Sequence, residues 1–233
     1  MQPLAFSKEL LPVGTRTEQG LERPRAVSEY VVERLVAGGA TRICFVIAPG
    51  KSDIVAYYGA STFSADVFYA VQPEPAGLCD AIFRAAPLVH DDDWVLVGLP
   101  DTIWYPEDAL ARLPPDPLSF LLFPVDQPQH FDAVVTDAEN RVQEIQVKQP
   151  GARSNWVWGA FRMSGRTMHE LRELWRLPER QDDMVGTLVN AYLARGGRAT
   201  AVREGTAYVD TGTIDGYREA LRLLASTSSP EST

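Results

Sequence analysis

Hydrophobic residues in the first half of the chain follow helical spacing in some segments and form short continuous runs in others. Val27, Val31 and Leu35 recur every four residues and predict a helix over residues 24–37. The run at 42–48 is apolar on both faces, which is typical of a central parallel strand. Helices are also predicted over 51–58, 77–86 and 106–113, and strands over 66–71, 94–98 and 118–125. This alternation predicts an α/β fold.

The pattern changes in the second half of the chain. Strands are predicted over 131–136, 141–147, 155–163 and 199–202, with helices over 166–176, 182–195 and about 214–224. The polar turn at 137–140 indicates that the first two of these strands form a hairpin. The chain shows no internal repeat and no linker. We therefore expect one domain over residues 1–225 and a flexible Ser/Pro/Thr-rich tail over 226–233.

Composition places the chain among globular proteins and argues against some classes of binding partner. Of 233 residues, 45% are hydrophobic and 23% are charged, and 22 basic against 31 acidic residues give a formal charge of −9. This acidic balance argues against a nucleic-acid partner, although a phosphorylated small substrate needs only a few cations. No apolar stretch approaches the ~18 residues of a membrane span, so no membrane partner is expected.

The cysteines and histidines indicate neither disulfides nor zinc. Cys44 lies inside an apolar run and is predicted to be a buried thiol, which suits a reducing cytoplasm. With Cys79 as the second cysteine, the chain has no disulfide framework, and we expect a cytoplasmic protein. The histidines at 90, 130 and 169 are widely spaced and far from both cysteines, which does not fit a zinc site.

Two segments carry residues that could contact a nucleotide. Lys8 could reach a phosphate as a point charge, or it could be a solvated surface lysine. Gln72 lies between a strand end and a helix start, where ligands of open α/β sheets bind, and its amide suits the edge of a pyrimidine base. Gly77 would let a flat ring approach the backbone. Taken alone, however, residues 71–78 are an ordinary Pro/Gly loop.

Two aspartates follow apolar residues at the ends of predicted strands. Asp101 comes just after the strand at 94–98, a frequent position for a magnesium ligand, but an aspartate there can equally cap a helix or form a turn. Asp210 could be a second metal carboxylate, or it could cap the helix that begins near Ile214. The acidic run at 90–93 precedes a strand, so it is placed at the opposite edge of the sheet as a solvated loop.

Seven segments, in this order, resemble sugar-1-phosphate nucleotidylyltransferases, and most of all the glucose-1-phosphate thymidylyltransferases and uridylyltransferases. They are SKELLPVG (7–14), the helix–strand unit 26–48, VQPEPAGL (71–78), GLPDTIWYP (98–106), VQEIQVKQP (142–150), SNWVWGAFRM (154–163) and YVDTGT (208–213). The resemblance implies a Rossmann-like, three-layer nucleotide-diphospho-sugar transferase fold with a mixed, mostly parallel sheet. It also implies transfer of a nucleotidyl group from an NTP (dTTP or UTP) to a sugar 1-phosphate, giving an NDP-sugar and pyrophosphate, with Mg²⁺ as cofactor.

The same resemblance implies roles for individual residues. Lys8 matches a lysine that contacts phosphates, and it is a catalytic candidate together with Asp101. Gln72 and Gly77 match residues that hold the base. Asp101 and Asp210 match the two carboxylates that bind Mg²⁺.

The match is weaker around the sugar. Gly159 matches a glycine of the sugar pocket. The family usually has Glu-Lys-Pro where this chain has Lys148, Gln149 and Pro150, so the carboxylate that contacts sugar hydroxyls is absent there. Lys148 could still supply a cation to the sugar phosphate from a shifted position.

The front of the chain also departs from the family. The family has a strand and a glycine-rich loop ahead of the lysine that Lys8 matches, and this chain begins inside that region. Either Met1 is an internal methionine of a longer chain, or the loop has been lost. In both cases we expect the first, central strand to be missing from residues 1–233. We also expect poor turnover by these residues alone, because such loops cradle the triphosphate.

The departures leave a rival hypothesis open. A catalytically impaired nucleotide-sugar-binding protein, with a regulatory or scaffolding role, is favoured by the missing loop and by Lys148 and Gln149, whereas the metal aspartates and Lys8 favour the enzyme. A glycosyltransferase is a weaker third hypothesis, because no Asp-x-Asp motif follows a strand. The expected partners are an NTP and a sugar 1-phosphate, and a homo-oligomer is also compatible. The base and the sugar are left open.

Overall fold

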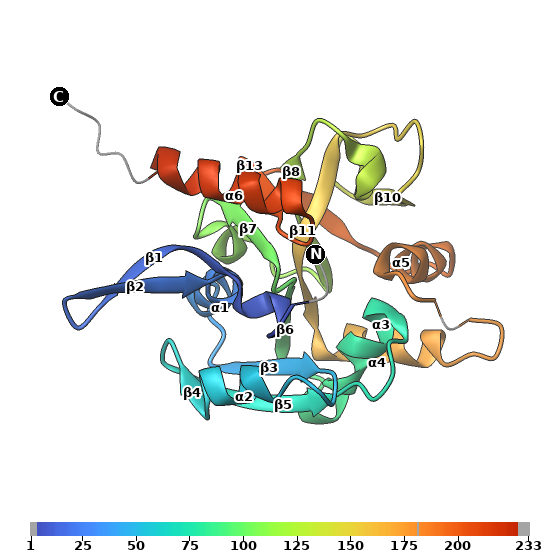
Figure 1. Cartoon of the computed structure of the whole chain (residues 1–233). Coiled ribbons are helices and arrows are strands. Elements are labelled where there is room, and N and C mark those ends of the chain that lie inside the picture. The colour runs from blue at the N-terminus through green and yellow to red at the C-terminus, as the bar shows by residue number, and fades with distance from the viewer. Residues whose placement is uncertain (1–3, 181, 228–233) are drawn as a thin grey trace.

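The chain is an α/β protein, as predicted (Figure 1). The computed structural model describes residues 4–180 and 182–227. Its helices are α1 (Val27–Ala37), α2 (Ser52–Tyr58), α3 (Gly77–Arg84), α4 (Gly165–Trp175), α5 (Val185–Ala194) and α6 (Ile214–Thr227), with 3-10 turns η1 (Lys8–Leu10), η2 (Ala86–Leu88), η3 (Ala109–Arg112) and η4 (Pro128–His130). Its strands are β1 (Pro12–Glu18), β2 (Leu21–Ala26), β3 (Arg42–Ile47), β4 (Ser61–Thr62), β5 (Ala65–Val71), β6 (Trp94–Gly98), β7 (Thr102–Tyr105), β8 (Leu118–Pro124), β9 (Asp132–Thr136), β10 (Val142–Val147), β11 (Trp156–Ser164), β12 (Thr200–Val202) and β13 (Ala207–Asp210).

The strands form several sheets, and most pairs are antiparallel. The largest sheet has the order β10-β9-β11-β8-β12, with β6 also paired to β11, and the smaller ones are β3-β5-β4, β7-β13 and β1-β2. Among the described residues, parallel pairing occurs between β3 and β5 and between β8 and β12. The prediction of a mostly parallel sheet is therefore wrong. The physical reason is β11, which lies between β6 and β8 and runs against both.

Two predicted helices differ from the structure. The helix predicted over residues 24–37 is α1, which begins only at Val27. Residues 24–26 belong instead to β2, which pairs with β1 as a hairpin. Pro24 fits in β2, since an edge strand tolerates a residue without a backbone N–H. The helix predicted over 106–113 is only the turn η3. Leu113 precedes a proline, which disfavours helical geometry, and too few residues remain to form a stable α-helix.

The other predicted helices and strands are found within a few residues of their expected positions. The predicted hairpin is formed by β9 and β10, and it is followed by β11, α4, α5 and β12. Helix α6 continues to Thr227, beyond the predicted end at 224. Residues 228–233 of the predicted tail lie outside the described residues.

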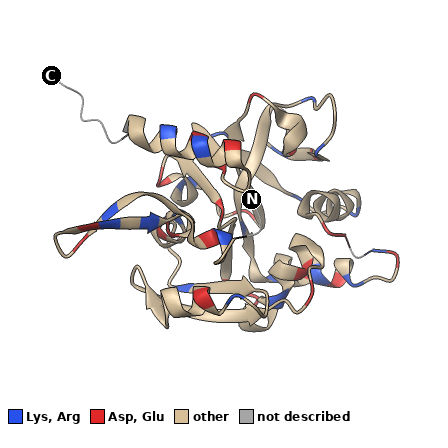
Figure 2. Ribbon diagram, viewed as in Figure 1, with Lys and Arg blue, Asp and Glu red and all other residues tan. Residues whose placement is uncertain are grey.

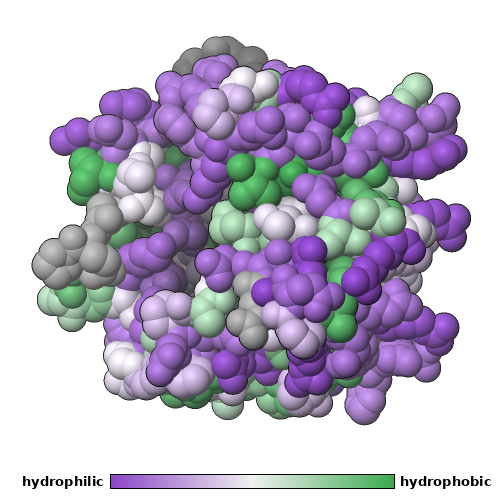
Figure 3. Space-filling model, turned by 90° about the vertical axis from the view of Figure 1, so that its right-hand side faces the viewer, coloured by the Kyte–Doolittle hydropathy of each residue, from purple (hydrophilic) through white to green (hydrophobic). Residues whose placement is uncertain are grey.

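Strand β8 forms the centre of the core because both of its faces are buried. Leu118, Phe120 and Leu122 face a hydrophobic cluster with α3, α4 and α5. Leu121 and Phe123 face a second cluster, built with β7, η3 and α1. The main sheet is thus covered on both sides. Within the described ranges, no helix is long and apolar enough to cross a membrane, and the face shown in Figure 3 is largely hydrophilic.

The turn η1 carries Lys8 and is held in place by polar contacts to two residues, Asp53 on α2 and Lys51 just before α2. Asp53 accepts hydrogen bonds from the backbone N–H and the hydroxyl of Ser7, both at 2.7 Å. The Ser7 N–H is the main reason that the pKa of Asp53 is lowered. Lys51 forms an ion pair with Glu9 on the same turn. These two contacts, which we call the η1 clamp, fix the position of Lys8.

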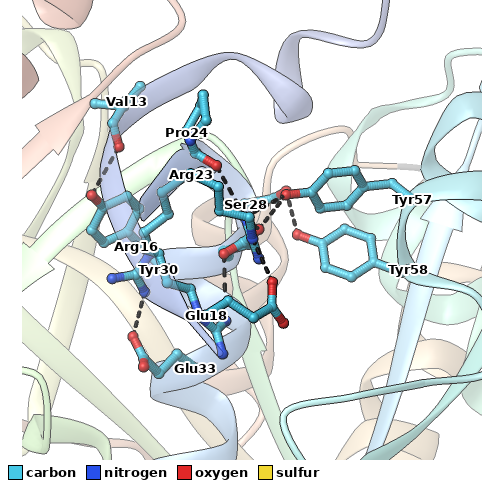
Figure 4. A network of polar contacts seen from close by, with 12 residues as sticks. Val13, Arg16, Glu18, Arg23, Pro24, Ser28, Tyr30, Glu33, Tyr57 and Tyr58 are labelled. Carbon is cyan, nitrogen blue, oxygen red and sulfur yellow. Dashed lines mark hydrogen bonds and ion pairs between the residues drawn. The ribbon is translucent and has the colours of Figure 1, made fainter. Parts of the chain in front are cut away.

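A second polar network joins the β1–β2 hairpin to α1 and α2 (Figure 4). Its centre is Glu29 on α1, which is almost fully buried. The Glu29 carboxylate accepts a hydrogen bond from Arg23 at 2.9 Å and another from the Tyr57 hydroxyl, and Arg16 lies 3.5 Å away. Acidic and basic residues lie side by side along this hairpin (Figure 2). A buried carboxylate is costly to leave without such partners, so the network ties the hairpin to the helices.

We expect Glu29→Ala to lower the free energy of unfolding by about 2 kcal/mol, because it removes the buried partner of Arg23 and Tyr57. Glu33→Ala, on the same helix, is the matched control. Its side chain is 44% exposed and pairs with Arg25, so its loss should cost less than about 1 kcal/mol. Urea unfolding followed by circular dichroism measures both values. Equal losses in the two variants would contradict the importance of burial here.

We expect Asp53→Asn to lower the free energy of unfolding by about 1 kcal/mol at pH 7, because it weakens both hydrogen bonds from Ser7. The lowered pKa means that the stabilising effect is present above the ordinary pKa of aspartate and is lost as the pH falls through the lowered value. The difference between the wild-type chain and the variant should therefore shrink toward about pH 3. Asp66→Asn, at an exposed position of β5, should show neither effect. A pH-independent difference at Asp53 would refute this account.

Candidate active site

Lys8 and Asp101 form the centre of the candidate site. Lys8 Nζ lies 2.6 Å from Asp101 Oδ2, and the two side chains are 34% and 17% exposed. Asp101 lies three residues after the end of β6, in the turn before β7, which is the end-of-strand position expected from the sequence. Burial lowers the pKa of the Lys8 ammonium, but the hydrogen bond and charge of Asp101 outweigh burial, so the net pKa is raised. Lys8 is therefore a cation at neutral pH, held against a carboxylate.

Strand β13 brings Asp210 next to Asp101. In the ladder between β7 and β13, Asp210 is paired with Thr102, the residue after Asp101. Thr211 donates its backbone N–H and its hydroxyl to the Asp101 carbonyl, at 2.8 and 2.9 Å. Part of Asp210 is exposed to solvent. The protein around its carboxyl group nevertheless removes some of the surrounding water, and this burial is the main cause of its raised pKa. The N–H of Gly212, 2.7 Å from the Asp210 carboxylate, opposes that rise, and the charge of Asp101 adds to it.

The two carboxylates face the same small space. A Cβ atom placed on Gly212 would lie 2.8 Å from Asp210 Oδ1 and 3.5 Å from Asp101 Oδ2. Two carboxylates, with the other ligand positions left to water and phosphate oxygens, are the arrangement that Mg²⁺ prefers. In the part of the chain that the structure describes, no group of three or more His, Cys, Asp and Glu side chains could hold a metal. Asp101 and Asp210 are thus the residues that could hold Mg²⁺ together with a phosphate.

Lys148 and Asp132 extend this cluster of charges. Lys148 follows β10 with a φ of +43°, and its backbone N–H donates to the carbonyl of Phe131 at 3.0 Å. Burial raises the pKa values of Asp132 and Asp210, and the Lys148 charge opposes the rise at both. Trp158 Nε1 donates to Asp132 at 3.3 Å. The Lys148 charge thus acts on Asp132 and on Asp210, one member of the acidic pair.

Gly159 lies against aromatic rings. A Cβ atom there would lie 2.5 Å from the ring of Tyr208 and 2.7 Å from that of Phe123, so only glycine fits. The register between β11 and β8 also shifts at this residue. Tyr208, two residues before Asp210, packs against Phe123 and Phe131, and burial raises its pKa. The structure explains the glycine by ring packing, and its role in a sugar pocket stays a prediction.

Gln72 and Gly77 belong to a separate loop at the end of β5. Gln72 Nε2 donates to the Gly77 carbonyl at 3.0 Å and to Asp80 at 2.9 Å. Gly77 has a φ of +82°, and a Cβ atom there would lie 2.6 Å from Asp183. The structure thus bonds these two predicted base contacts to each other and not to the acidic pair. With its amide nitrogen engaged in this way, Gln72 has its amide oxygen left to accept a hydrogen bond from a base.

Three polar residues near the site were not singled out from the sequence. Lys51 and Asp53 follow β3, the same end-of-strand position that drew attention to Gln72, so this signal could have identified them. Asp132 has no comparable signal. In the sequence it lies at the start of a strand that is predicted to form one half of a hairpin. Its burial against Trp158 is a tertiary contact, which the sequence pattern does not show.

Comparison with known proteins identifies the family of this chain. The profile of the family described as nucleotidyl transferase matches residues 7–227. A glucose-1-phosphate thymidylyltransferase of Neisseria meningitidis is 26% identical over 227 residues, which are 94% of this chain and 75% of that protein. A glucose-1-phosphate thymidylyltransferase of Mycolicibacterium smegmatis is 25% identical over 226 residues, which are 93% of this chain and 74% of that protein.

Solved structures show the same fold. A structure from Bacillus anthracis, described as a putative glucose-1-phosphate thymidylyltransferase in complex with sucrose, matches with a TM-score of 0.77 at 23% identity, over 94% of this chain and 86% of that one. A UTP-bound UGPase from Acinetobacter baumannii matches with a TM-score of 0.74 at 21% identity, over 97% and 88% of the two chains. The predicted resemblance is confirmed at the level of the family: with a profile match over nearly its whole length, the chain belongs to the nucleotidyl transferase family.

Proposed function

We propose that this chain transfers a nucleotidyl group from dTTP or UTP to a sugar 1-phosphate, releasing pyrophosphate. The observation that carries the proposal is the convergence of Lys8, Asp101 and Asp210 from three distant segments. The relatives named glucose-1-phosphate thymidylyltransferase and the UTP-bound neighbour support this choice of substrates.

The reaction needs no protein nucleophile. An oxygen of the sugar phosphate is already an anion, and it forms a bond to the α-phosphorus of the NTP. The bond between the α-phosphorus and the bridging oxygen breaks, and pyrophosphate leaves with that electron pair. The protein must align two polyanions and offset their charge, which is a task of positioning and electrostatics.

The residues of the site can divide this task. Lys8, whose raised pKa keeps it protonated, would exchange its contact with Asp101 for phosphate oxygens of the NTP. Asp101 and Asp210 would hold Mg²⁺, which when bound supplies positive charge to the phosphate oxygens. Lys148 would bind the phosphate of the sugar. Gln72 would accept a hydrogen bond from the base.

A nucleotide-sugar-binding protein without turnover is the second candidate. The observations that favour it are the replacement of the usual Glu-Lys pair by Lys148 and Gln149, and the direct 2.6 Å contact that engages Lys8 with Asp101. In that case a nucleotide would bind, but no pyrophosphate would be released.

We expect Lys8→Met, Asp101→Asn and Asp210→Asn each to lower kcat/KM by at least about 100-fold, because each removes charge stabilisation at the reacting phosphates. The assay is pyrophosphate release from dTTP or UTP with glucose 1-phosphate and Mg²⁺. Removing Mg²⁺ with EDTA should abolish release, and added Mg²⁺ should restore it. Glu139→Gln, in an exposed turn, is the control and should keep the wild-type rate.

Two results would change this proposal. Unaltered rates in both aspartate variants would exclude the two-carboxylate metal site. Calorimetric binding of UTP by the wild-type chain, without pyrophosphate release from either NTP, would support the binding protein instead.

We expect Gln72→Ala to weaken UTP binding by about 1–3 kcal/mol, or roughly 5- to 150-fold, because a polar edge of the base would lose its partner. Gln143→Ala, at an exposed position of β10, should leave the affinity unchanged. Isothermal titration calorimetry measures both affinities. The same affinity in Gln72→Ala as in the wild-type chain would place the base elsewhere.

A further inference from the structure

Asp132 is a buried carboxylate that the proposed reaction does not use. It is the first residue of β9 and is 7% exposed. Among the described residues, its Oδ1 atom has no hydrogen-bond partner, and the Trp158 indole donates one long hydrogen bond, of 3.3 Å, to its Oδ2 atom. A carboxylate offers about four acceptor positions, so most of those of Asp132 are unfilled. Burial of a charged group without full hydrogen bonding destabilises the fold, so this residue needs another explanation.

Strand pairing places a cation beside this carboxylate. Asp132 is paired with Val147 in the ladder between β9 and β10, and Lys148 is the next residue. The Lys148 N–H donates to the carbonyl of Phe131, the residue before Asp132, at 3.0 Å. Lys148 is exposed, and its φ of +43° is a left-handed conformation that residues with side chains rarely adopt and that is frequent at ligand sites. Backbone bonds thus hold an acceptor and a cation next to each other.

Tyr208 connects Asp132 to the acidic pair of the candidate site. Burial is the main cause of the raised pKa of Tyr208, and the charges of Asp210, Asp101 and Asp132 add to the rise. All three carboxylates therefore lie near this one side chain. In the part of the chain that the structure describes, no three acidic side chains converge as a metal site, so Asp132 is not a third metal ligand. It borders the candidate site as a group with a different task.

The chemistry of the two neighbours identifies the kind of ligand that fits them. A carboxylate with unfilled acceptor positions accepts hydrogen bonds from hydroxyl groups and repels phosphate. The Lys148 ammonium, in contrast, attracts phosphate as a point charge. A ligand that carries a phosphate at one position and hydroxyls around a ring, as a sugar 1-phosphate does, matches both groups at once.

We propose that Asp132 is a specificity-determining residue, which accepts a hydrogen bond from one hydroxyl of the sugar ring while Lys148 binds the sugar phosphate. This inference rests on the proposed function and narrows its substrate class to sugar 1-phosphates with a hydroxyl opposite Asp132. No bond to the reacting phosphorus forms or breaks at this carboxylate. The unfilled acceptor positions of the free chain become bonded when the sugar is bound, so a sugar without that hydroxyl leaves them unmet.

Kinetics on the full chain test this role. The probe is the one of glucose, galactose and mannose 1-phosphate that gives the wild-type chain its highest kcat/KM, with UTP or dTTP and Mg²⁺. Asp132→Ala should raise the KM for the sugar 1-phosphate at least about tenfold and leave the KM for the NTP within about twofold. Asp92→Ala removes an exposed aspartate from the loop before β6 and should change neither value. An unchanged KM for the sugar 1-phosphate in Asp132→Ala overturns the inference.

Analogues of the sugar distinguish a direct contact from an indirect effect. The probes are the 2-, 3-, 4- and 6-deoxy derivatives of the same sugar 1-phosphate. One of them should lose at least about tenfold in kcat/KM with the wild-type chain, and that loss should disappear in Asp132→Ala, because the same hydrogen bond is removed from either side. If every deoxy derivative loses as much with Asp132→Ala as with the wild-type chain, no hydroxyl contacts Asp132.

Stability provides a readout that does not depend on activity. Asp132→Asn removes the buried charge but keeps the shape, so its urea midpoint should equal or exceed that of the wild-type chain. A lower midpoint would mean that the carboxylate serves the fold, and it would overturn the inference. Circular dichroism verifies that Asp132→Ala folds before its kinetics are compared.

Failure of this inference can be separated from failure of the proposed function. Turnover by the wild-type chain without any effect of Asp132→Ala refutes the inference alone. If the wild-type chain releases no pyrophosphate from any of these substrate pairs, the proposed function fails, and calorimetric titration with the three sugar 1-phosphates decides on Asp132. Binding that Asp132→Ala weakens at least about tenfold would then support the contact, and absence of binding, or equal binding by both chains, would overturn it.

Discussion

The candidate site depends on the pairing of β13 with β7. Without that ladder, Asp101 is a turn residue after β6, and Asp210 is a residue before α6. The ladder places Asp210 opposite Thr102. The hydrogen bonds from Thr211 to the Asp101 carbonyl then hold the two turns, and so Asp101 and Asp210, close together. The two carboxylates then face one space despite their mutual repulsion. The two carboxylates are thereby brought together by backbone hydrogen bonds, which do not depend on the charges of the side chains.

Cations placed around this acidic pair limit the cost of that repulsion. Lys8 contacts Asp101 directly, and Lys148 acts on Asp210 from the end of β10. Lys8 in turn depends on the η1 clamp, in which Asp53 holds one end of the turn. The buried sheet around β8 is the rigid support, whereas the charged groups lie on turns and strand ends. Such a division is common where binding residues must meet a ligand at the surface.

The cavity between β3 and β6 and the charged cluster around Asp101 are different places in this molecule. The cavity is lined largely by apolar side chains of α1 and α3, whereas the cluster around Asp101 is polar and partly exposed. Phosphate chemistry requires the polar environment of the cluster. The two places come together at Glu9 and Pro100, next to the turn that carries Lys8.

The sequence by itself determined the α/β class and most helix and strand positions, because these follow from hydrophobic spacing. Its motifs also drew attention to Lys8, Asp101 and Asp210, which the structure brings together. It did not determine the antiparallel character of the main sheet, since the insertion of β11 between β6 and β8 is a long-range pairing without a local signal. The convergence of Asp101 with Asp210 and the burial of Asp132 and Glu29 were likewise decided by tertiary structure. The physical reason is that side-chain burial and strand pairing depend on residues far apart in the chain, whereas spacing patterns report only on close neighbours.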